Sequence, residues 1–238
     1  MPPKSGKLIV VSTPIGNLED ISIRAINSLK ASDLIACENT KHSSILLNKY
    51  DITSKRISLH KFNEASRIES LIKALDEGKL VAYISDAGTP LISDPGARLV
   101  HKVASANHEI QIIPGPSAVT SAIAGAGLPA NKFFFGGFLS TKKGSRSKEL
   151  DQALLREETS VFFESPHRIQ STLEILNEKS PERQLVIARE MTKKFEEFIR
   201  GTVKEIKNVF NERSPKGEFV LIISGVKLPK SFNFNTIE

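Results

Sequence analysis

The sequence predicts an α/β fold with two α/β domains, the N-terminal one around a mostly parallel sheet and the C-terminal one around a mixed sheet. In the first half of the 238-residue chain, short aliphatic runs alternate with segments whose apolar residues recur at helical spacing. Short connections between such segments favour parallel strands covered by helices. A Gly- and Pro-rich stretch, 125–129, then precedes a half in which two strands are close enough along the chain to form a hairpin.

The first half supplies the strands and helices of the predicted parallel sheet. Strands are expected at 7–12, 33–38, 56–60, 80–85 and 109–113, and helices at 21–31, 42–50, 62–77 and 96–106. In the longest of these helices Ile68, Ile72 and Leu75 fall on one face. Gly78 then provides its C-terminal stop.

The second half supplies the predicted mixed sheet. Strands are expected at 133–139, 160–163, 184–190, 195–201 and 218–224, and helices near 147–156, 167–177 and 203–211. The domains are therefore predicted at 1–124 and 125–226, with 125–129 as the joint between them. Residues 227–238 lack periodicity and are expected to be a loose tail.

Composition excludes several classes of protein. Apolar residues make up 39% and charged residues 25%, as in a globular protein able to bury a core. The net charge of +6 is compatible with a polyanionic partner. One cysteine, Cys37, allows no internal disulfide, and we expect it to be buried in a strand. The apolar runs are too short to span a bilayer or to form a signal peptide, so a cytoplasmic protein without membrane contact is expected.

Five loops predicted at the carboxyl ends of the first-half strands are rich in Gly, Pro, Ser, Thr and Asp. They are 13–17, 38–42, 60–64, 85–95 and 114–118. Parallel sheets bind ligands beyond the carboxyl ends of their strands, and small loop residues let the backbone approach a ligand. Any one loop could be an ordinary turn, but together the five predict a ligand site.

The loop 85–95 is the most informative of these. Asp94 and Pro95 are expected to begin a helix, with Asp94 as its cap, so Asp86 is the better ligand candidate. Gly115 and Ser117 stand at an expected helix start, which suits either an anion site or a routine serine cap. The loop 13–17 matches neither the dinucleotide fingerprint nor a P-loop.

Other chemistries find less support. The five histidines have no HxxxH or CxxC pairing, so no metal is expected, and no GxSxG elbow nominates a serine nucleophile. Basic residues concentrate in 142–148, expected as a loop that is either simply solvated or a phosphate-gripping arm. Arg168 and Arg189 lie beside Glu164 and Glu190 in sequence, which fits salt bridges as readily as substrate contacts.

Nine sequence motifs together resemble one family closely. In order they are VSTPIGNLEDIS, ENTKHS, HKFNE, SDAGTPLISDPG, PGPSA, LPANKFFFGGFL, FFESPHR, AREMTK and KGEFVLI, covering roughly residues 8–225. They resemble the 16S rRNA cytidine 2′-O-methyltransferase branch of the tetrapyrrole (corrin/porphyrin) methylase superfamily. The resemblance implies a homodimer with S-adenosyl-L-methionine in a cleft between two domains. It also implies methyl transfer to a cytidine ribose in the decoding region of 16S rRNA within the small ribosomal subunit.

The resemblance also implies roles for individual residues. The cofactor-binding set would be Ser85, Asp86, Ala87, Gly88, Thr89, Ser117, Ala118, Phe163, Glu190, Met191, Glu218 and Phe219. The substrate side would hold Pro14, Gly16 and Asn17 together with Lys41, and the basic residues expected to contact RNA are Lys142, Lys143, Arg146, Lys148 and Arg168. The general base would be one of Glu38, His42, His60 and Glu64, a choice that the sequence leaves open.

The chain departs from the family pattern at four positions. Asn39 stands where the family usually has aspartate, Lys41 replaces an arginine, Phe62 often corresponds to a histidine, and Ser140 to a proline.

The sequence also leaves two other functions open. One is methylation of a small tetrapyrrole within the same superfamily; the other is a non-catalytic ribosome-assembly or RNA-binding module.

Overall fold

The computed structural model describes residues 6–60, 62–228, 232 and 234. Its internal contacts divide the chain into two compact units, Met1–Ser117 and Ala118–Glu238, each of which is described by itself. The division falls after Ser117 rather than after residue 124, because helix α5 (Ala118–Ala126) packs on strands of the second unit. The stretch predicted as the joint therefore begins inside a helix, at Gly125.

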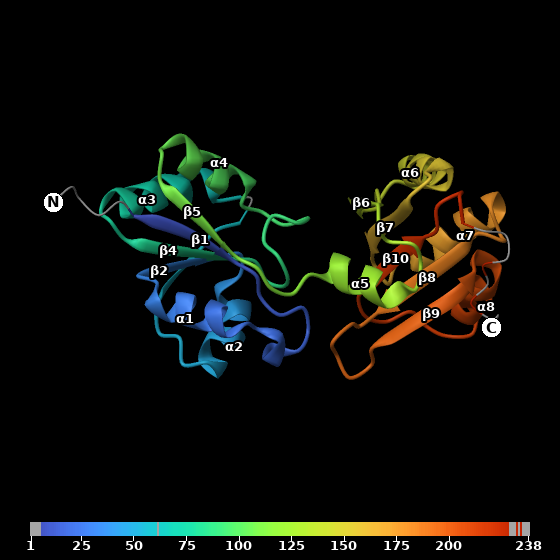
Figure 1. Ribbon diagram of the computed structural model, residues 1–238, viewed down its shortest axis with the longest axis horizontal. Helices are drawn as coiled ribbons and strands as arrows, with labels where there is room; N and C mark the ends of the chain where they lie inside the picture. The colour runs from blue at the N-terminus through green and yellow to red at the C-terminus, as the bar shows by residue number, and fades with distance from the viewer. Residues whose placement is uncertain (1–5, 61, 229–231, 233, 235–238) are drawn as a thin grey trace. The chain divides into compact units, whose positions relative to one another are not determined.

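The first unit is a five-stranded parallel sheet between two layers of helices (Figure 1). The strand order is β3-β2-β4-β1-β5. The strands are β1 (Lys7–Val11), β2 (Leu34–Cys37), β3 (Lys55–Ser58), β4 (Leu80–Ile84) and β5 (Glu109–Ile113). The helices are η1 (Leu18–Asp20, a 3-10 turn), α1 (Ile23–Ala31), α2 (Thr40–Lys49), α3 (Glu64–Asp76) and α4 (Ala97–Ser105).

Each face of this sheet has its own core. Ile9 and Val11 of β1 pack with the helices α1 and α2, whereas Leu8 and Val10 pack with α3 and α4. The alternation follows from the two-residue period of a strand, and burial on both faces explains why these strands read as continuous apolar runs. The predicted parallel sheet and its nine segments are confirmed to within a few residues.

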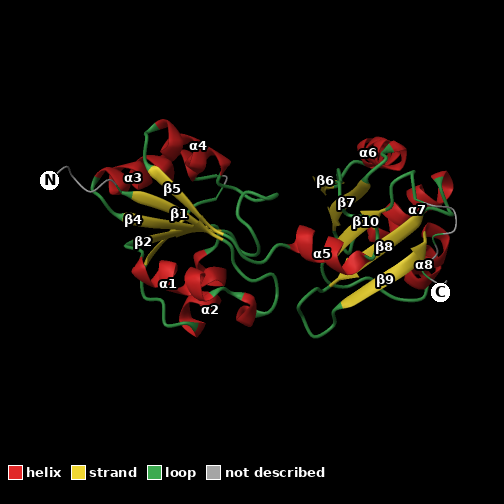
Figure 2. Ribbon diagram, viewed as in Figure 1, coloured by secondary structure: helices red, strands yellow, loops and turns green. Residues whose placement is uncertain are grey.

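The second unit is a five-stranded mixed sheet in the order β6-β7-β10-β8-β9. Its strands are β6 (Phe133–Phe138), β7 (Thr159–Glu164), β8 (Gln184–Arg189), β9 (Glu197–Thr202) and β10 (Phe219–Ile223). Besides α5, its helices are α6 (Lys143–Leu155), α7 (Ile169–Lys179) and α8 (Val203–Asn211). Strands β8 and β9 form the predicted hairpin (Figure 2). Among the described strands of this sheet, only β6 and β7 run parallel.

One expectation for this unit is wrong, and another lies mostly outside the described residues. The basic segment 142–148 is not a loop, because α6 starts at Lys143. Of the predicted tail 227–238, residues 229–231, 233 and 235–238 lie outside the described part, and Lys227 forms an ion pair with Glu157 (2.7 Å). Within the described residues, no helix has the length and apolar character that crossing a bilayer requires.

Candidate functional site

The loops that follow the strands of the first sheet, here called the carboxyl edge, are joined by hydrogen bonds. Thr13 and Gly88 form an isolated antiparallel pair in which each N–H donates to the other's carbonyl, at 2.9 and 3.0 Å. Gly88 has a φ of +75°, a conformation that glycine adopts without strain. The loops after β1 and β4 are therefore fixed to each other by their backbones.

A chain of hydroxyl groups extends this connection to the loop after β5. The Ser12 hydroxyl donates to the Thr89 hydroxyl (3.1 Å), and the Thr89 hydroxyl donates to the Pro116 carbonyl (3.2 Å). A Cβ at Gly115 would lie 3.0 Å from the Cβ of Ser12, so a side chain there would have to displace the serine. The sequence prediction that small residues bring these loops together is consistent with this packing.

The loops after β2, β3 and β4 surround a cavity of about 420 Å³. Its lining comprises Glu38, Asn39, Thr40, Lys41, Ser58, His60 and Asp86. It therefore brings together Glu38 and His60, two of the four base candidates, with the predicted ligand Asp86. Asn39, a departure from the family pattern, caps helix α2 by accepting from the N–H groups of Lys41 and His42, and its own N–H donates to Asp86 (3.2 Å).

The surroundings of Glu38 raise its pKa, which makes the carboxylate a better proton acceptor. Burial raises its pKa, the carboxylates of Asp86 and Asp94 raise it further, and His60 opposes the shift. A base works best when its pKa approaches the working pH. The surroundings of Glu38 therefore suit it to act as a base.

The other three candidates are less well arranged. The Phe62 N–H donates to Nδ1 of His60 (3.3 Å), so the neutral imidazole carries its proton on Nε2, which can donate but cannot accept. His42 is exposed on α2 and does not line the cavity. Glu64 is 8% exposed at the start of α3, and it too lies outside the cavity lining.

Asp94 belongs to this edge, although the sequence predicted a helix cap. Helix α4 starts after Gly96, whose φ is +115°, and no side chain of the described residues caps it. Burial and Asp86 raise the pKa of Asp94, and a hydrogen bond with Ser85 opposes them. The prediction missed this role because an Asp-Pro-Gly sequence is typical of a helix start, whereas the fold needs Gly96 where a Cβ would meet the Tyr83 ring at 2.4 Å.

The residues predicted on the substrate side of the first loop differ in exposure. Pro14 is buried, whereas Gly16 and Asn17 are exposed. The Asn17 side chain accepts a hydrogen bond from the Glu19 N–H and so caps the 3-10 turn η1.

In the second unit, the segments after β8 and before β10, which carry residues of the predicted cofactor set, are bonded to each other. The Glu190 carboxylate accepts from the Glu218 N–H (2.9 Å) and from Lys193 (3.0 Å), which also pairs with Glu218. Burial raises the pKa of Glu190, but these partners outweigh it and lower the pKa overall. Met191 is 8% exposed, and the Phe219 side chain is in the core against Phe210. Phe219 can therefore offer only its backbone to a ligand.

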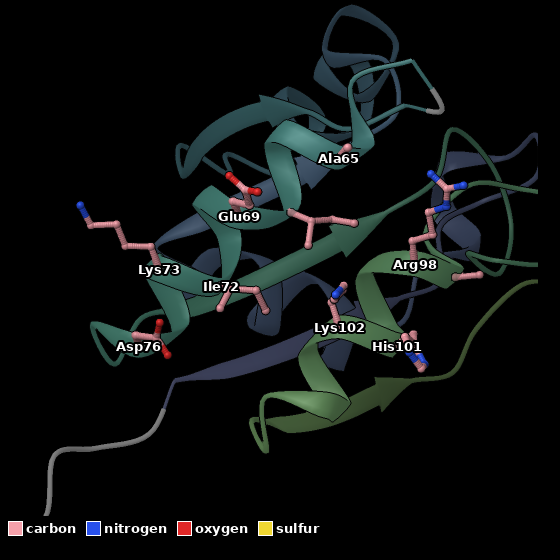
Figure 3. A pocket seen from close by; sticks show the side chains of 10 residues that line it. Ala65, Glu69, Ile72, Lys73, Asp76, Arg98, His101 and Lys102 are labelled. Atoms are coloured by element: carbon pink, nitrogen blue, oxygen red, sulfur yellow. The ribbon is translucent and has the colours of Figure 1, made fainter.

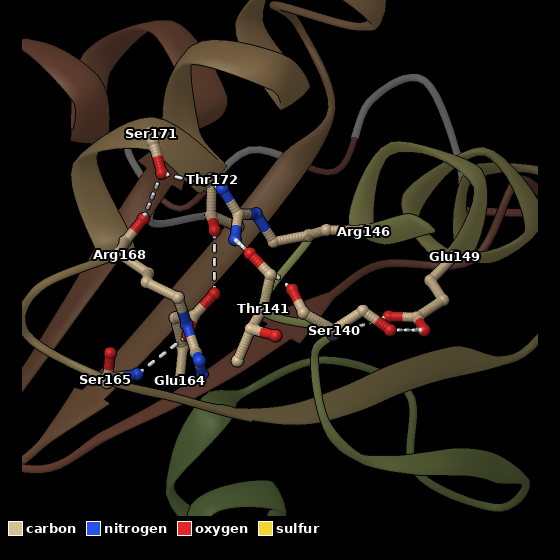
Figure 4. A network of polar contacts seen from close by, with 9 residues as sticks. All are labelled: Ser140, Thr141, Arg146, Glu149, Glu164, Ser165, Arg168, Ser171 and Thr172. Atoms are coloured by element: carbon tan, nitrogen blue, oxygen red, sulfur yellow. Dashed lines mark hydrogen bonds and ion pairs between the residues drawn. The ribbon is translucent and has the colours of Figure 1, made fainter. Parts of the chain in front are cut away.

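Two of the basic residues expected to contact RNA are engaged inside the second unit (Figure 4). Arg146 is 4% exposed and donates to the carbonyls of Ser140 and Thr141 and to the Ser171 hydroxyl. Arg168 pairs with the buried Glu164 at 2.8 Å. Arg146 is therefore a structural residue, which corrects the expectation that it contacts RNA.

The remaining lysines of the basic segment are free to meet solvent. Lys142, Lys143 and Lys148 are exposed, and none makes an ion pair with the residues that the structure describes. Ser140, where the family usually has proline, donates its N–H to Glu149 (2.9 Å), a bond that proline could not make.

A second hollow of about 860 Å³ lies between α3 and α4. Figure 3 shows its lining side chains, with apolar Ile72 beside charged Glu69, Lys73, Arg98 and Lys102. None of the predicted site residues lines it, so it is separate from the carboxyl edge.

The family model for tetrapyrrole (corrin/porphyrin) methylases matches residues 7–207 of the chain. The chain belongs to this family. That membership confirms the resemblance read from the motifs, and this tetrapyrrole methylase has close relatives within the family. It is 48% identical to "Ribosomal RNA small subunit methyltransferase I" of Thermotoga maritima, over 92% of the chain and 99% of that protein. It is 42% identical to the protein of the same name from Bacillus subtilis, over 92% of the chain and 75% of that protein.

Solved structures support the fold of this tetrapyrrole methylase. Diphthine synthase aligns with a TM-score of 0.70 and 14% identity over 93% of the chain and 90% of that protein. The uroporphyrin-III-C-methyltransferase of Thermus thermophilus aligns with a TM-score of 0.64 and 20% identity, over 91% and 94% of the two chains. S-adenosyl-L-methionine is the cofactor that methyltransferases of this family use.

The carboxyl edge fits such a cofactor chemically. S-adenosylmethionine carries ribose hydroxyls and an ammonium group. Both donate hydrogen bonds, which a carboxylate such as Asp86 can accept. Gly88 is buried and both of its backbone groups are bonded to Thr13, whereas Ala87 is exposed and Asp86 is half-buried, so a ligand would meet the loop at Asp86 and Ala87. The donor set of the edge is thus suited to a nucleoside that bears a positive charge.

Proposed function

We propose that the protein is an S-adenosylmethionine-dependent methyltransferase that methylates the ribose 2′-hydroxyl of a cytidine in the decoding region of 16S rRNA. The observation that carries the proposal is the position of Glu38, half-buried, with a raised pKa, in a cavity shared with Asp86 and Lys41. A ribose hydroxyl is a weak nucleophile, so it needs a base close to a cofactor site. The names of the relatives support rRNA of the small subunit as the substrate.

In this proposal the first unit holds the cofactor through the loop after β4. Asp86 would accept from the hydroxyl or ammonium groups of the cofactor, while Ser85, Ala87, Gly88 and Thr89 would form the walls of its site. S-adenosylmethionine supplies an activated methyl group, so the protein has to align the ribose oxygen and exclude water. Alignment of this kind contributes up to ~7–11 kcal/mol to a reaction between bound groups.

The remaining residues of the proposed cofactor site come from the other loops. They are Ser117, Ala118, Glu190, Met191, Glu218 and the backbone of Phe219. Glu190 and Glu218 are already linked through Lys193, which would keep this loop pair in one arrangement.

Glu38 would take the proton from the ribose hydroxyl as the methyl group is transferred. Its raised pKa makes it a stronger base for the proton that the ribose oxygen releases as it bonds to the methyl carbon, and the His60 Nε2–H could donate to a substrate oxygen. Lys41 lines the same cavity and would pair with a phosphate of the substrate, although without the two-pronged geometry of an arginine.

RNA would also meet the exposed lysines of the second unit, Lys142, Lys143 and Lys148. Uncompensated lysines attract polyanions and release counterions when they bind phosphates. The small ribosomal subunit, rather than a free nucleoside, is therefore the proposed substrate. A homodimer is part of this proposal.

The test is methyl transfer from tritiated S-adenosylmethionine to purified small subunits that lack the modification, followed by mass spectrometry of the rRNA. The expected result is one added methyl group on a cytidine ribose. Binding of the subunits without transfer would instead identify a non-catalytic assembly factor. The Asp86→Ala variant should lose cofactor binding in calorimetry while its thermal unfolding stays cooperative, and wild-type affinity would remove Asp86 from the site.

A further inference from the structure

A β-bulge in β6 places Phe138 on the same face of the second sheet as Phe135 and Phe163. Phe135 pairs with Val161 and Phe138 with Phe163, so three residues of β6 span the length of two in β7. Val161 and Phe163 share a face because they are two residues apart, and therefore their partners share it too. Without the bulge, Phe138 would point into the core.

Glycine makes the bulge possible. Gly137 has a φ of +68°, which few other residues adopt. A Cβ at Gly136 would lie 2.2 Å from the Phe162 ring, so that position also requires glycine. The sequence FFFGGF thus encodes a strand that turns its last aromatic ring outward.

Rings of this face contact one another but remain open to solvent. The Phe135 and Phe163 centroids are 5.1 Å apart, and those of Phe138 and Phe163 are 5.2 Å apart. Phe138 is 59% exposed and Phe133 is 40% exposed. We call Phe133, Phe135, Phe138 and Phe163 the aromatic face.

The two sides of the second sheet are covered differently. The side opposite the aromatic face is buried under α6, α7 and α8, where Phe162 packs edge-on against Phe134 (6.0 Å between centroids). On the side of the aromatic face, α5 packs on β8, β9 and β10. The exposed rings of β6 and β7 therefore lie on the part of the sheet that α5 does not cover.

A polar network fixes the backbone behind these rings (Figure 4). The Leu139 N–H donates to the Phe163 carbonyl (3.3 Å), which continues the β6–β7 pairing past the bulge. Glu164, next to Phe163, accepts from Arg168 and from the Thr172 hydroxyl (2.7 Å). The Arg146 guanidinium joins the turn after β6 to Ser171 of α7 (2.9 Å). The rings are thus held on a rigid support.

Exposed positive charge follows the aromatic face along the chain. Lys142 and Lys143 follow Phe138 within five residues, and both are exposed. Exposed aromatic rings with free lysines a few residues away are a combination that binds single-stranded nucleic acid, since a base can stack on an exposed ring while lysines contact phosphates.

We propose that the aromatic face, with Phe138 as its most exposed ring, stacks unpaired bases of the RNA substrate. This inference rests on the proposed function, which it deepens by assigning the surface that recognises RNA bases. A second copy of the chain is the less favoured occupant, because a two-fold interface would bring two sets of the same lysines together. Phe163, which the resemblance places near the cofactor, serves here as the ring on which Phe135 and Phe138 rest.

Fluorescence offers a direct test because the chain contains no tryptophan. The Phe138→Trp variant therefore has one reporter, and a single-stranded RNA oligonucleotide from the decoding region should quench its emission. The same RNA as a duplex should quench much less, and S-adenosylhomocysteine alone should not quench it. Phe195→Trp, at a position 62% exposed between β8 and β9, is the matched control and should keep its emission. Unchanged emission of the Phe138→Trp variant with single-stranded RNA, or quenching by S-adenosylhomocysteine alone, would overturn the inference.

Affinity gives a second test. Phe138→Leu keeps the apolar character but loses the ring, so its Kd for single-stranded RNA should rise about 5- to 150-fold, the range that one stacked base contributes. Phe138→Tyr should restore it. An unchanged Kd would overturn the inference, as would a leucine variant that only shifts from dimer to monomer in sedimentation.

Wild-type methyl transfer to small subunits keeps this test separate from that of the proposed function. Transfer by the wild type, without quenching of the Phe138→Trp variant, refutes stacking and leaves the methyltransferase proposal intact. Quenching without transfer refutes the methyltransferase proposal and leaves stacking intact.

Discussion

The two units present opposite chemistry at their exposed surfaces. The carboxyl edge of the first unit gathers carboxylates whose pKa values are raised, such as Glu38 and Asp94. The second unit presents phenylalanine rings and unpaired lysines along β6 and the start of α6. Carboxylates repel phosphates and suit proton transfer, whereas rings and lysines suit capture of RNA. Under the proposed function, the chemistry is assigned to the first unit and RNA binding largely to the second.

The largest effect that this division predicts is on Glu38. Glu38→Gln keeps the shape of the side chain but cannot accept a proton, so kcat for methyl transfer should fall about 10²–10⁴-fold. Affinity for S-adenosylmethionine and for RNA should stay near that of the wild type, because neither is assigned to this residue. Single-turnover kinetics on small subunits measure the first quantity and calorimetry the second.

Glu69→Gln on α3, an exposed carboxylate of the other hollow, is the matched control and should keep its rate. A Glu38→Gln enzyme with nearly normal kcat would show that another group removes the proton. The raised pKa of Glu38 would then not identify the base.

The next effect concerns the lysines of the second unit. Lys142→Ala/Lys143→Ala should lower the slope of log K against log salt by about 1.4, since each phosphate contact to single-stranded RNA contributes about 0.7. This change corresponds to about 25-fold weaker binding at 0.1 M salt relative to extrapolation from 1 M. Cofactor affinity should not change.

The double variant Lys204→Ala/Lys207→Ala removes the same charge from α8 and serves as its control. Equal salt slopes for the two double variants would mean that only net charge attracts RNA, with no local surface.

A third effect separates Arg146 from its neighbouring lysines. Arg146→Ala leaves the half-buried acceptors Ser140 O and Ser171 Oγ without their donor, which costs about 1 kcal/mol for each, at the low end of the range of about 1–3 kcal/mol for an unpaired group because water can reach them. Thermal and urea unfolding should therefore show a marked loss of stability. Lys148→Ala, on the same helix but exposed, should unfold like the wild type. A stable Arg146→Ala protein with a reduced salt slope would restore Arg146 as an RNA contact.

Much of the fold follows from the sequence because strands buried on both faces and helices with one apolar face have clear patterns. The rule that loops meet beyond the carboxyl ends of parallel strands correctly brought Glu38, His60 and Asp86 together. The start of α6 could not be predicted, since Gly144 is a poor helix former and only the buried Arg146 explains the order there. The bulge in β6 escaped prediction for a related reason, because it depends on contacts with a neighbouring strand.

The smallest predicted effect tests whether the acidic edge acts as one electrostatic unit. Asp94 raises the pKa of Glu38, though less than burial and Asp86 do. In Asp94→Asn that contribution disappears, so the pKa of Glu38 falls and the acidic limb of the kcat profile should move to lower pH.

The Asp94→Asn substitution should also change how the stability of the folded protein depends on pH. Asp94 itself has a raised pKa when folded, so the folded state binds more protons than the unfolded state between the ordinary value of 3.8 and the folded value. The contribution of Asp94 to the stability of the wild type therefore decreases as pH rises through that window, and Asp94→Asn should unfold at a higher temperature than the wild type above it but not below it. Asp51→Asn, an exposed carboxylate after α2, is the control for charge alone. If Asp94→Asn leaves the acidic limb in place, Asp94 does not act on Glu38, and burial together with Asp86 accounts for the raised pKa.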